Sequence, residues 1–229
     1  MAMTQQHDDT ATTHERRFPM SYDDFLAWAD EDVHAEWAEG EVTVFMPPNI
    51  RHQFIANFFQ ALLTLFADAF DLGDVLGAPL EMRARPDGPA REPDILSIAA
   101  AHRDRLTPQR LAGPADLVVE IISNESARRD RSDKFYEYEA AGITEYLLID
   151  PRATKERVDF YRLTEAKKYL AVLPDGVGRY HSTVLPGFWF DPAWFWATST
   201  PNPLLTLVEI APDALAPVMA ALAARERDE

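Results

Sequence analysis

The feature of the sequence that most constrains the fold is the run "LVVEII" at residues 117–122, in which Glu120 alone interrupts aliphatic side chains. A short apolar run rich in β-branched residues predicts a buried β-strand. A lone carboxylate inside such a strand is energetically costly unless it is paired, protonated or bound to a metal ion. The run therefore predicts a central strand, and Glu120 requires a partner.

The segments around this run predict a mixed α/β protein. Residues 126–141 have a helical pattern that Gly142 closes, and residues 49–70 have a wide apolar helical face, with Gly73 as the expected helix stop. The other expected elements are a helix in "SYDDFLAWAD", a hairpin around Glu39-Gly40, strands over 75–85 and 94–99, the strand "EYLLID", and an antiparallel meander of "RVDFYRL", "KKYLAVL" and "GRYHSTV". We expect a central mixed β-sheet flanked by helices, with the meander and a C-terminal helix added.

Three regions are expected along the 229 residues. Residues 1–17 predict a disordered leader, residues 18–200 the folded domain, and residues 201–229 a C-terminal helical tail. The sequence has neither a signal-peptide core nor an apolar run long enough to span a bilayer. We therefore expect a cytoplasmic protein that is not held in a membrane.

The composition narrows the chemistry. There are no cysteines, which excludes disulfides, thiolate zinc sites and a cysteine nucleophile, and the six histidines lack zinc-ligand spacing. A metal ion would therefore be a hard cation held by carboxylates. The net charge of −16 argues against a broad nucleic-acid-binding surface, so an anionic partner requires a local basic patch or a metal ion.

Two acids occupy positions from which they could form such a metal site. Asp94 follows Pro93 and directly precedes the strand "ILSIA", whereas Glu120 lies within its own strand. If the two strands are neighbours, the carboxylates meet at one end of the sheet, where they repel each other unless a cation lies between them. Mg²⁺ or Mn²⁺ suits two carboxylates, polarises a phosphoryl oxygen and acidifies a bound water.

The helix after Glu120 supplies positive charge. Lys134 shares a helical face with Asp130 and Tyr138, and it could reach back toward the strand end to stabilise an attacking water or developing phosphoryl charge. The start of this helix also has a basic cluster, from which we expect phosphate contacts, made of Arg128, Arg129 and Arg131.

The order of these motifs resembles the PD-(D/E)xK nuclease superfamily. The segments "REPDILSI", "DLVVEIIS", "RDRSDKFYEYEAAGITEYLLIDP" and "RVDFYRL" are similar to the bacterial restriction endonuclease family of the Uma-two type. The upstream "HAEWAEGEVTVFMPPNIRHQFIANFF" also fits that family. The resemblance covers about residues 20–190 and implies a restriction-endonuclease-like core within residues 18–200.

The resemblance implies roles for individual residues. Asp94, Glu120 and the backbone carbonyl of Ile121 would be the metal ligands. The superfamily signature has a lysine two residues after the second acid, but this chain has Ile122 there, and the resemblance assigns the catalytic lysine to Lys134 on the following helix.

Two upstream residues also match the family pattern. Glu36 and His52 would line the site or adjust the metal. The implied activity is Mg²⁺- or Mn²⁺-dependent cleavage of DNA by an endonuclease. Because cutting both strands needs two active sites, a homodimer is expected.

Other interpretations of the same residues remain open. Glu120 could form a structural ion pair with Arg91 or Arg131, and Asp94 could be a turn residue. Lys134 could be a solvated lysine paired with Asp130. The chain could then be a non-catalytic relative that binds protein or nucleic acid, or a phosphodiesterase for RNA or a small nucleotide.

Overall fold

The protein is built on a six-stranded mixed sheet. The structure, a computed structural model, describes residues 16–29, 33–45, 48–216 and 219. The strand order is β11-β10-β9-β8-β6-β4, and only β8 and β9 are parallel neighbours. These strands are β4 (Gly73–Gly77), β6 (Ile95–Ala99), β8 (Leu117–Ile121), β9 (Glu145–Asp150), β10 (Arg157–Leu163) and β11 (Tyr169–Ala171). The predicted α/β fold with a central mixed sheet is confirmed.

The connection between β8 and β9 is helical, as a crossover between parallel strands requires. The single helix predicted over residues 126–141 is divided into α3 (Ala127–Arg131) and α4 (Asp133–Ala141). The break is at Ser132, whose φ of −123° and ψ of −73° lie outside the helical region. Gly142 closes α4 with a left-handed φ of 86°, as predicted.

Different helices pack on the two faces of the central sheet. Along β8, Val119 and Ile121 belong to the core cluster beneath α2, whereas Val118 and Ile122 belong to the cluster beneath α4. Successive side chains of a strand point to opposite faces. Glu120 therefore faces α4, the helix that carries the predicted lysine.

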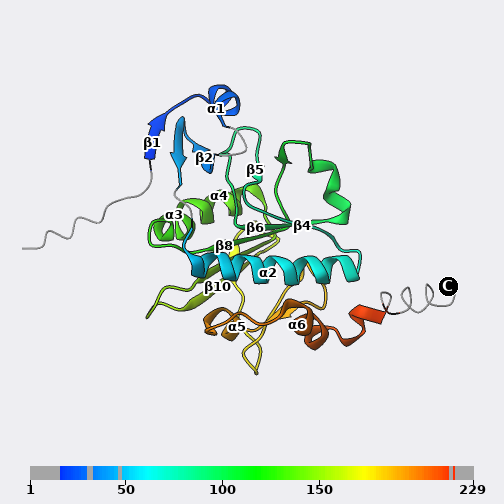
Figure 1. Cartoon of the computed structure of the whole chain (residues 1–229). Helices are drawn as coiled ribbons and strands as arrows, with labels where there is room; N and C mark the ends of the chain where they lie inside the picture. The colour runs from blue at the N-terminus through cyan, green and yellow to red at the C-terminus, as the bar shows by residue number, and fades with distance from the viewer. Residues whose placement is uncertain (1–15, 30–32, 46–47, 217–218, 220–229) are drawn as a thin grey trace, which may run out of the picture.

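The long helix α2 (Ile50–Ala69) covers the first face, and α5 (Ala193–Trp196) and α6 (Pro203–Ile210) lie beside it (Figure 1). Asn49 caps α2 by accepting the backbone N–H of His52 at 2.9 Å. The stripe buried against the sheet has the three- and four-residue spacing predicted from the sequence and is made of Ile55, Phe58, Phe59, Leu62, Leu63 and Phe66.

The N-terminal segment forms a separate three-stranded sheet above α4 (Figure 1). It consists of β1 (Arg16–Pro19), β2 (Ala35–Ala38) and β3 (Glu41–Val44), with α1 (Tyr22–Trp28) after β1. The hairpin predicted at Glu39-Gly40 joins β2 to β3. Among the described residues, Trp37 and Ala90 exchange backbone hydrogen bonds of 2.8 and 3.0 Å, which tie this sheet to the loop before β6.

Some predicted elements differ in the structure. Gly73 begins β4 instead of stopping the preceding helix, which ends at Ala69. The strand predicted over 75–85 is interrupted at Pro79, after which β5 (Glu81–Arg83) pairs with β7 (Arg110–Ala112) outside the central sheet. Proline has no N–H to donate to a ladder, which favours such a break.

The predicted meander is wrong in its third strand. β10 and β11 pair antiparallel as expected, but β12 (Tyr180–His181) pairs with β13 (Trp189–Phe190) and not with β11. Tyr180 stacks on Phe190 with ring centroids 5.3 Å apart, and this aromatic contact joins β12 to the core beneath α2.

The two ends of the chain lie mostly outside the described residues. The leader predicted over 1–17 overlaps β1 at Arg16 and Arg17, and the rest of it stays a prediction. In the tail, α6 and the 3-10 helix Pro212–Leu215 are helical, and nearly all later residues are not described. Within the described part of the chain, no helix is long and apolar enough to cross a membrane.

We expect Gly73→Ala to destabilise the protein strongly. Gly73 has a φ of +142°, and a Cβ there would lie 2.0 Å from the backbone oxygen of Ile98 on β6. The strained backbone alone costs about 1–3 kcal/mol in the free energy of unfolding, and the clash with backbone adds to this. Urea denaturation measures the loss. Gly176→Ala is the matched control, because a Cβ there meets nothing within 4 Å, and equal stability of the two variants would contradict the argument.

Candidate active site

A cleft of about 600 Å³ opens where β8 ends and β6 begins. Five different parts of the chain bring a predicted site residue to it: β2, α2, the segment before β6, β8 and α4. The residues predicted as catalytic, auxiliary or metal-binding all line this cleft, namely Glu36, His52, Asp94, Glu120, Ile121 and Lys134.

Asp94 is held at the end of β8 by one of its two oxygens. Oδ2 accepts the backbone N–H of Ile121 at 2.6 Å and lies 3.2 Å from Nε2 of His52. The antiparallel register of β6 and β8 produces this contact, because Ile95 lies opposite Val119 and the residue before β6 therefore lies beside the last two residues of β8. The side chain is 20% exposed, and no donor to Oδ1 is found among the described residues.

Among the described residues, Glu120, like Asp94, is held by protein donors at only one of its two carboxylate oxygens. Its Oε1 accepts from Nζ of Lys134 at 2.8 Å and from the hydroxyl of Tyr138 at 3.0 Å. The described part of the chain contains no donor to Oε2. Burial raises the pKa of Glu120 to about 8, because Lys134 only partly offsets it and the charges of Asp130, Asp94 and Glu36 add to it.

Lys134 is buried among carboxylates. Nζ lies 2.8 Å from Oε1 of Glu36, 2.8 Å from Oε1 of Glu120 and 3.6 Å from Oδ1 of Asp130, and the side chain is only 3% exposed. Burial by itself lowers the pKa of a lysine, but these three carboxylates outweigh it and raise the pKa of Lys134 above its ordinary value. Lys134 is therefore an ammonium group directed at the end of β8.

His52 contacts the oxygen of Asp94 that the protein already holds, because its Nε2 lies 3.2 Å from Oδ2. Burial lowers the pKa of His52, but the hydrogen bond to Asp94 and the negative charges of Asp94 and Asp130 outweigh this effect and raise it. Its Nδ1 is buried and has no hydrogen-bond partner among the described residues. The imidazole therefore fixes the Oδ2 side of Asp94.

The predicted arginine cluster does not form one surface. Arg128 is exposed and does not line the cleft. Arg131 is engaged by Asp150 at 3.0 Å and Asp159 at 3.3 Å, because α3 ends beside the end of β9. Arg129 alone lines the cleft, where its guanidinium lies over the ring of Phe45 and 3.7 Å from Glu36.

Two further acids of the site are not among the residues predicted from the sequence. Asp130 is buried with Oδ1 3.6 Å from Nζ of Lys134, and burial raises its pKa. Its position four residues before Lys134 had indicated only a helical ion pair. Glu92 also lines the cleft, and no pattern in the sequence separates it from an ordinary loop acid.

The structural partners considered for Glu120 are engaged elsewhere. Arg91 binds Glu36 and Glu137, and Arg131 binds Asp150 of β9 and Asp159 of β10. Glu120 instead forms its ion pair with Lys134, the lysine that the resemblance assigned to the site.

The donors fit a small divalent cation. Asp94 and Glu120 each have one oxygen fixed by protein donors, and the second oxygen has no donor among the described residues. No group of three or more His, Cys, Asp or Glu side chains in the described chain is arranged to hold a metal. A cation would therefore rest on two carboxylates and the predicted carbonyl of Ile121, with water as further ligands, as Mg²⁺ prefers.

We expect Glu92→Gln to remove a pH-dependent loss of stability. Burial, and after it the charge of Glu36, raises the pKa of Glu92 from 4.5 to about 8. The stability that this raised pKa contributes is complete below the unfolded pKa and is lost as pH rises through about 8. Between about pH 5 and about pH 9, the variant should gain about 1 kcal/mol or more in free energy of unfolding relative to wild type. Urea denaturation at both pH values measures the gain.

The control for this experiment is Glu125→Gln. Glu125 lines the same cleft but is exposed. Its substitution should leave the pH dependence of stability unchanged. A gain that is equal in both variants would contradict the role of burial at Glu92.

Comparisons with known proteins bear on the family and the fold of this chain. The chain matches the model of the Uma2 family, described as "Putative restriction endonuclease", over residues 22–193. Its fold is similar to that of a crystallised "putative nuclease belonging to DUF820" from Anabaena variabilis, with a TM-score of 0.61 and 15% identity, over 78% of this chain and 98% of that chain. No curated protein matches. Because the family model spans most of the chain, this protein belongs to the Uma2 family.

Proposed function

We propose that this protein is a metal-dependent phosphodiester hydrolase that acts as a DNA endonuclease. The observation that carries the proposal is the shared arrangement of Asp94 and Glu120, each with one oxygen held by the protein and one left for a cation. Mg²⁺ or Mn²⁺ bound by these residues and the Ile121 carbonyl would polarise a phosphoryl oxygen and acidify a water.

Lys134 would act through its charge. Three carboxylates within 3.6 Å keep its ammonium protonated, so that it stabilises negative charge developing on the phosphoryl group and does not accept a proton. Its burial strengthens this effect, because charges interact more strongly where water is excluded. Tyr138 and Lys134 together hold Glu120 in one orientation.

The charge of the cleft bears on the substrate. Its arginine and lysine residues are Arg129, Lys134 and Arg152. They are outnumbered by the acids that line it, namely Glu36, Glu92, Asp94, Glu120, Glu125 and Asp130. Phosphate binding would therefore depend strongly on the metal. The same excess of acids favours, as a second candidate, a phosphodiesterase for RNA or a small nucleotide, which needs fewer phosphate contacts.

We expect Asp94→Asn and Glu120→Gln each to lower Mg²⁺-dependent DNA cleavage by about 100-fold or more, because several kcal/mol of transition-state stabilisation depend on the metal. Calorimetric titration with Mn²⁺ should show the loss of the same site. Glu125→Gln is the control, since it removes an exposed acid from the same cleft and should retain both properties. Folded Asp94→Asn and Glu120→Gln proteins that cut DNA at the wild-type rate would refute the proposal.

The substrate is tested by the wild-type protein. With Mg²⁺ or Mn²⁺ present, we expect cleavage of duplex DNA, and cleavage confined to RNA or a cyclic dinucleotide would instead support the second candidate. Cutting both strands by one protein would need two sites. We therefore expect sedimentation to show a homodimer, and a monomer that makes double-strand cuts in one binding event would contradict this expectation.

A further inference from the structure

Glu36 reaches the active site from outside the central sheet. It lies on β2, and among the described strands the three-stranded N-terminal sheet shares no ladder with the six-stranded one. The side chain is nevertheless only 2% exposed and lines the cleft. The N-terminal sheet thus supplies a buried charge to a site that is otherwise made by the nuclease-like core.

The contacts of Glu36 differ in kind from those of Asp94 and Glu120. Oε1 accepts from Nζ of Lys134 at 2.8 Å and from the backbone N–H of Glu92 at 3.3 Å. Oε2 accepts from Nη1 of Arg91 at 3.0 Å. Since both oxygens are used by protein donors, Glu36 is suited to anchoring cationic side chains and not to binding a metal ion.

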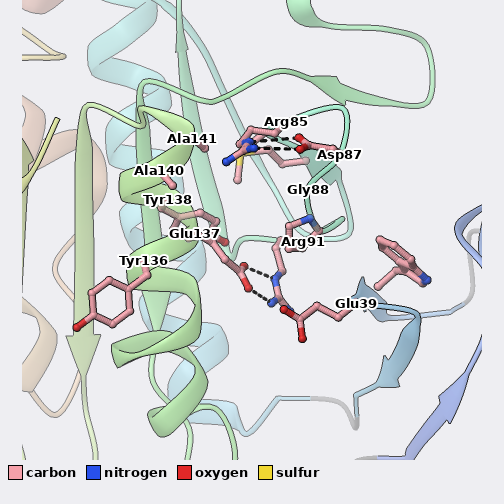
Figure 2. Close-up of a pocket in the computed structure, with 14 residues that line it drawn as sticks. Glu39, Arg85, Asp87, Gly88, Arg91, Tyr136, Glu137, Tyr138, Ala140 and Ala141 are labelled. Atoms are coloured by element: carbon pink, nitrogen blue, oxygen red, sulfur yellow. Dashed lines mark hydrogen bonds and ion pairs between the residues drawn. The ribbon is translucent and has the colours of Figure 1, made fainter.

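Arg91 connects Glu36 to the helix that carries Lys134. Its Nε and Nη2 donate to the two carboxylate oxygens of Glu137 at 2.9 and 2.6 Å, and Figure 2 shows this paired contact. Glu137 lies on α4, three residues after Lys134. Glu36 therefore holds α4 twice, directly through Lys134 and indirectly through Arg91, and the contacts form a closed ring.

This ring constrains the lysine side chain. A lysine has several rotatable bonds, and holding it in one conformation costs rotamer entropy. Glu120 contacts the ammonium from β8 and Glu36 contacts it from β2, both at 2.8 Å. Without Glu36, the ammonium would have only the carboxylates of Glu120 and Asp130 to bind.

We propose that Glu36 is a positioning residue that seats the ammonium of Lys134 at the active site, and that Arg91 in turn seats Glu36. The predicted effect on catalysis rests on the proposed nuclease function. The predicted effect on the position of the Lys134 side chain does not. A purely structural ion pair between the N-terminal sheet and the core would affect stability alone. A positioning residue also changes the lysine and the catalytic rate in protein that remains folded.

The first test observes the lysine directly in metal-free protein. The ¹H–¹⁵N signal of the Lys134 ammonium, assigned by its absence in Lys134→Met, should exchange slowly with water in the wild type because Nζ is buried and held. Glu36→Gln should broaden it or speed its exchange at least about tenfold, whereas Glu36→Asp, which keeps the charge, should restore it in part.

The matched control is Glu139→Gln. Glu139 is also on α4 and is also paired with a lysine, since its Oε1 lies 2.6 Å from Nζ of Lys168, but it does not line the cleft. Its substitution removes an ion pair of the same kind and should leave the Lys134 signal unchanged. If Glu36→Gln does not fold, Glu137→Gln, which loosens Arg91, should give the same effect in weaker form.

The second test is kinetic. Glu36→Gln should lower kcat for Mg²⁺-dependent cleavage by about 10- to 100-fold with little change in KM, and Glu139→Gln should change neither. An unaltered Lys134 signal in folded Glu36→Gln, or an equal change in Glu139→Gln, would overturn the inference. If the wild type cleaves no nucleic acid, the proposed function fails, but the ammonium signal still decides whether Glu36 seats Lys134.

Discussion

The structure depends on one buried ammonium group and the carboxylates around it. Lys134 lies within 3.6 Å of Glu36, Glu120 and Asp130, which come from β2, β8 and α3. An acid buried in an apolar strand is costly, and so is a buried lysine, but each reduces the cost of the other when the hydrogen bonds are short. The cluster therefore joins these three elements to α4, which carries Lys134, at the point where the cleft opens.

The same cluster is too acidic to be satisfied by the lysine alone. Burial and neighbouring carboxylates keep the pKa of Glu120 near 8 even with Lys134 in contact. Such a strained group of acids in a cleft is typical of a functional site, and a divalent cation would relieve it. Structural stability and the proposed chemistry thus depend on the same few side chains.

The hydrogen bonds of the three acids indicate which of them could bind a metal ion and which anchors cationic side chains. Asp94 and Glu120 each use one oxygen for protein donors, whereas Glu36 uses both. The first pattern suits a metal ligand, and the second suits an anchor for cationic side chains. The residue type is nearly the same in all three cases, so only the local donors distinguish the roles.

The sequence by itself determined the central strand, the helical stripe of α2 and the order of Asp94, Glu120 and Lys134, because these depend on local periodicity and on the short chain between β8 and α4. It did not determine the partners of Glu36, since Arg91 and Glu36 are 55 residues apart and meet only when the N-terminal sheet docks. Nor did it reveal that Ser132 divides the helix and that Arg131 pairs with acids of β9 and β10. Those outcomes were decided by the tertiary structure, because a charged side chain pairs with whichever opposite charge the packing of distant elements brings within reach.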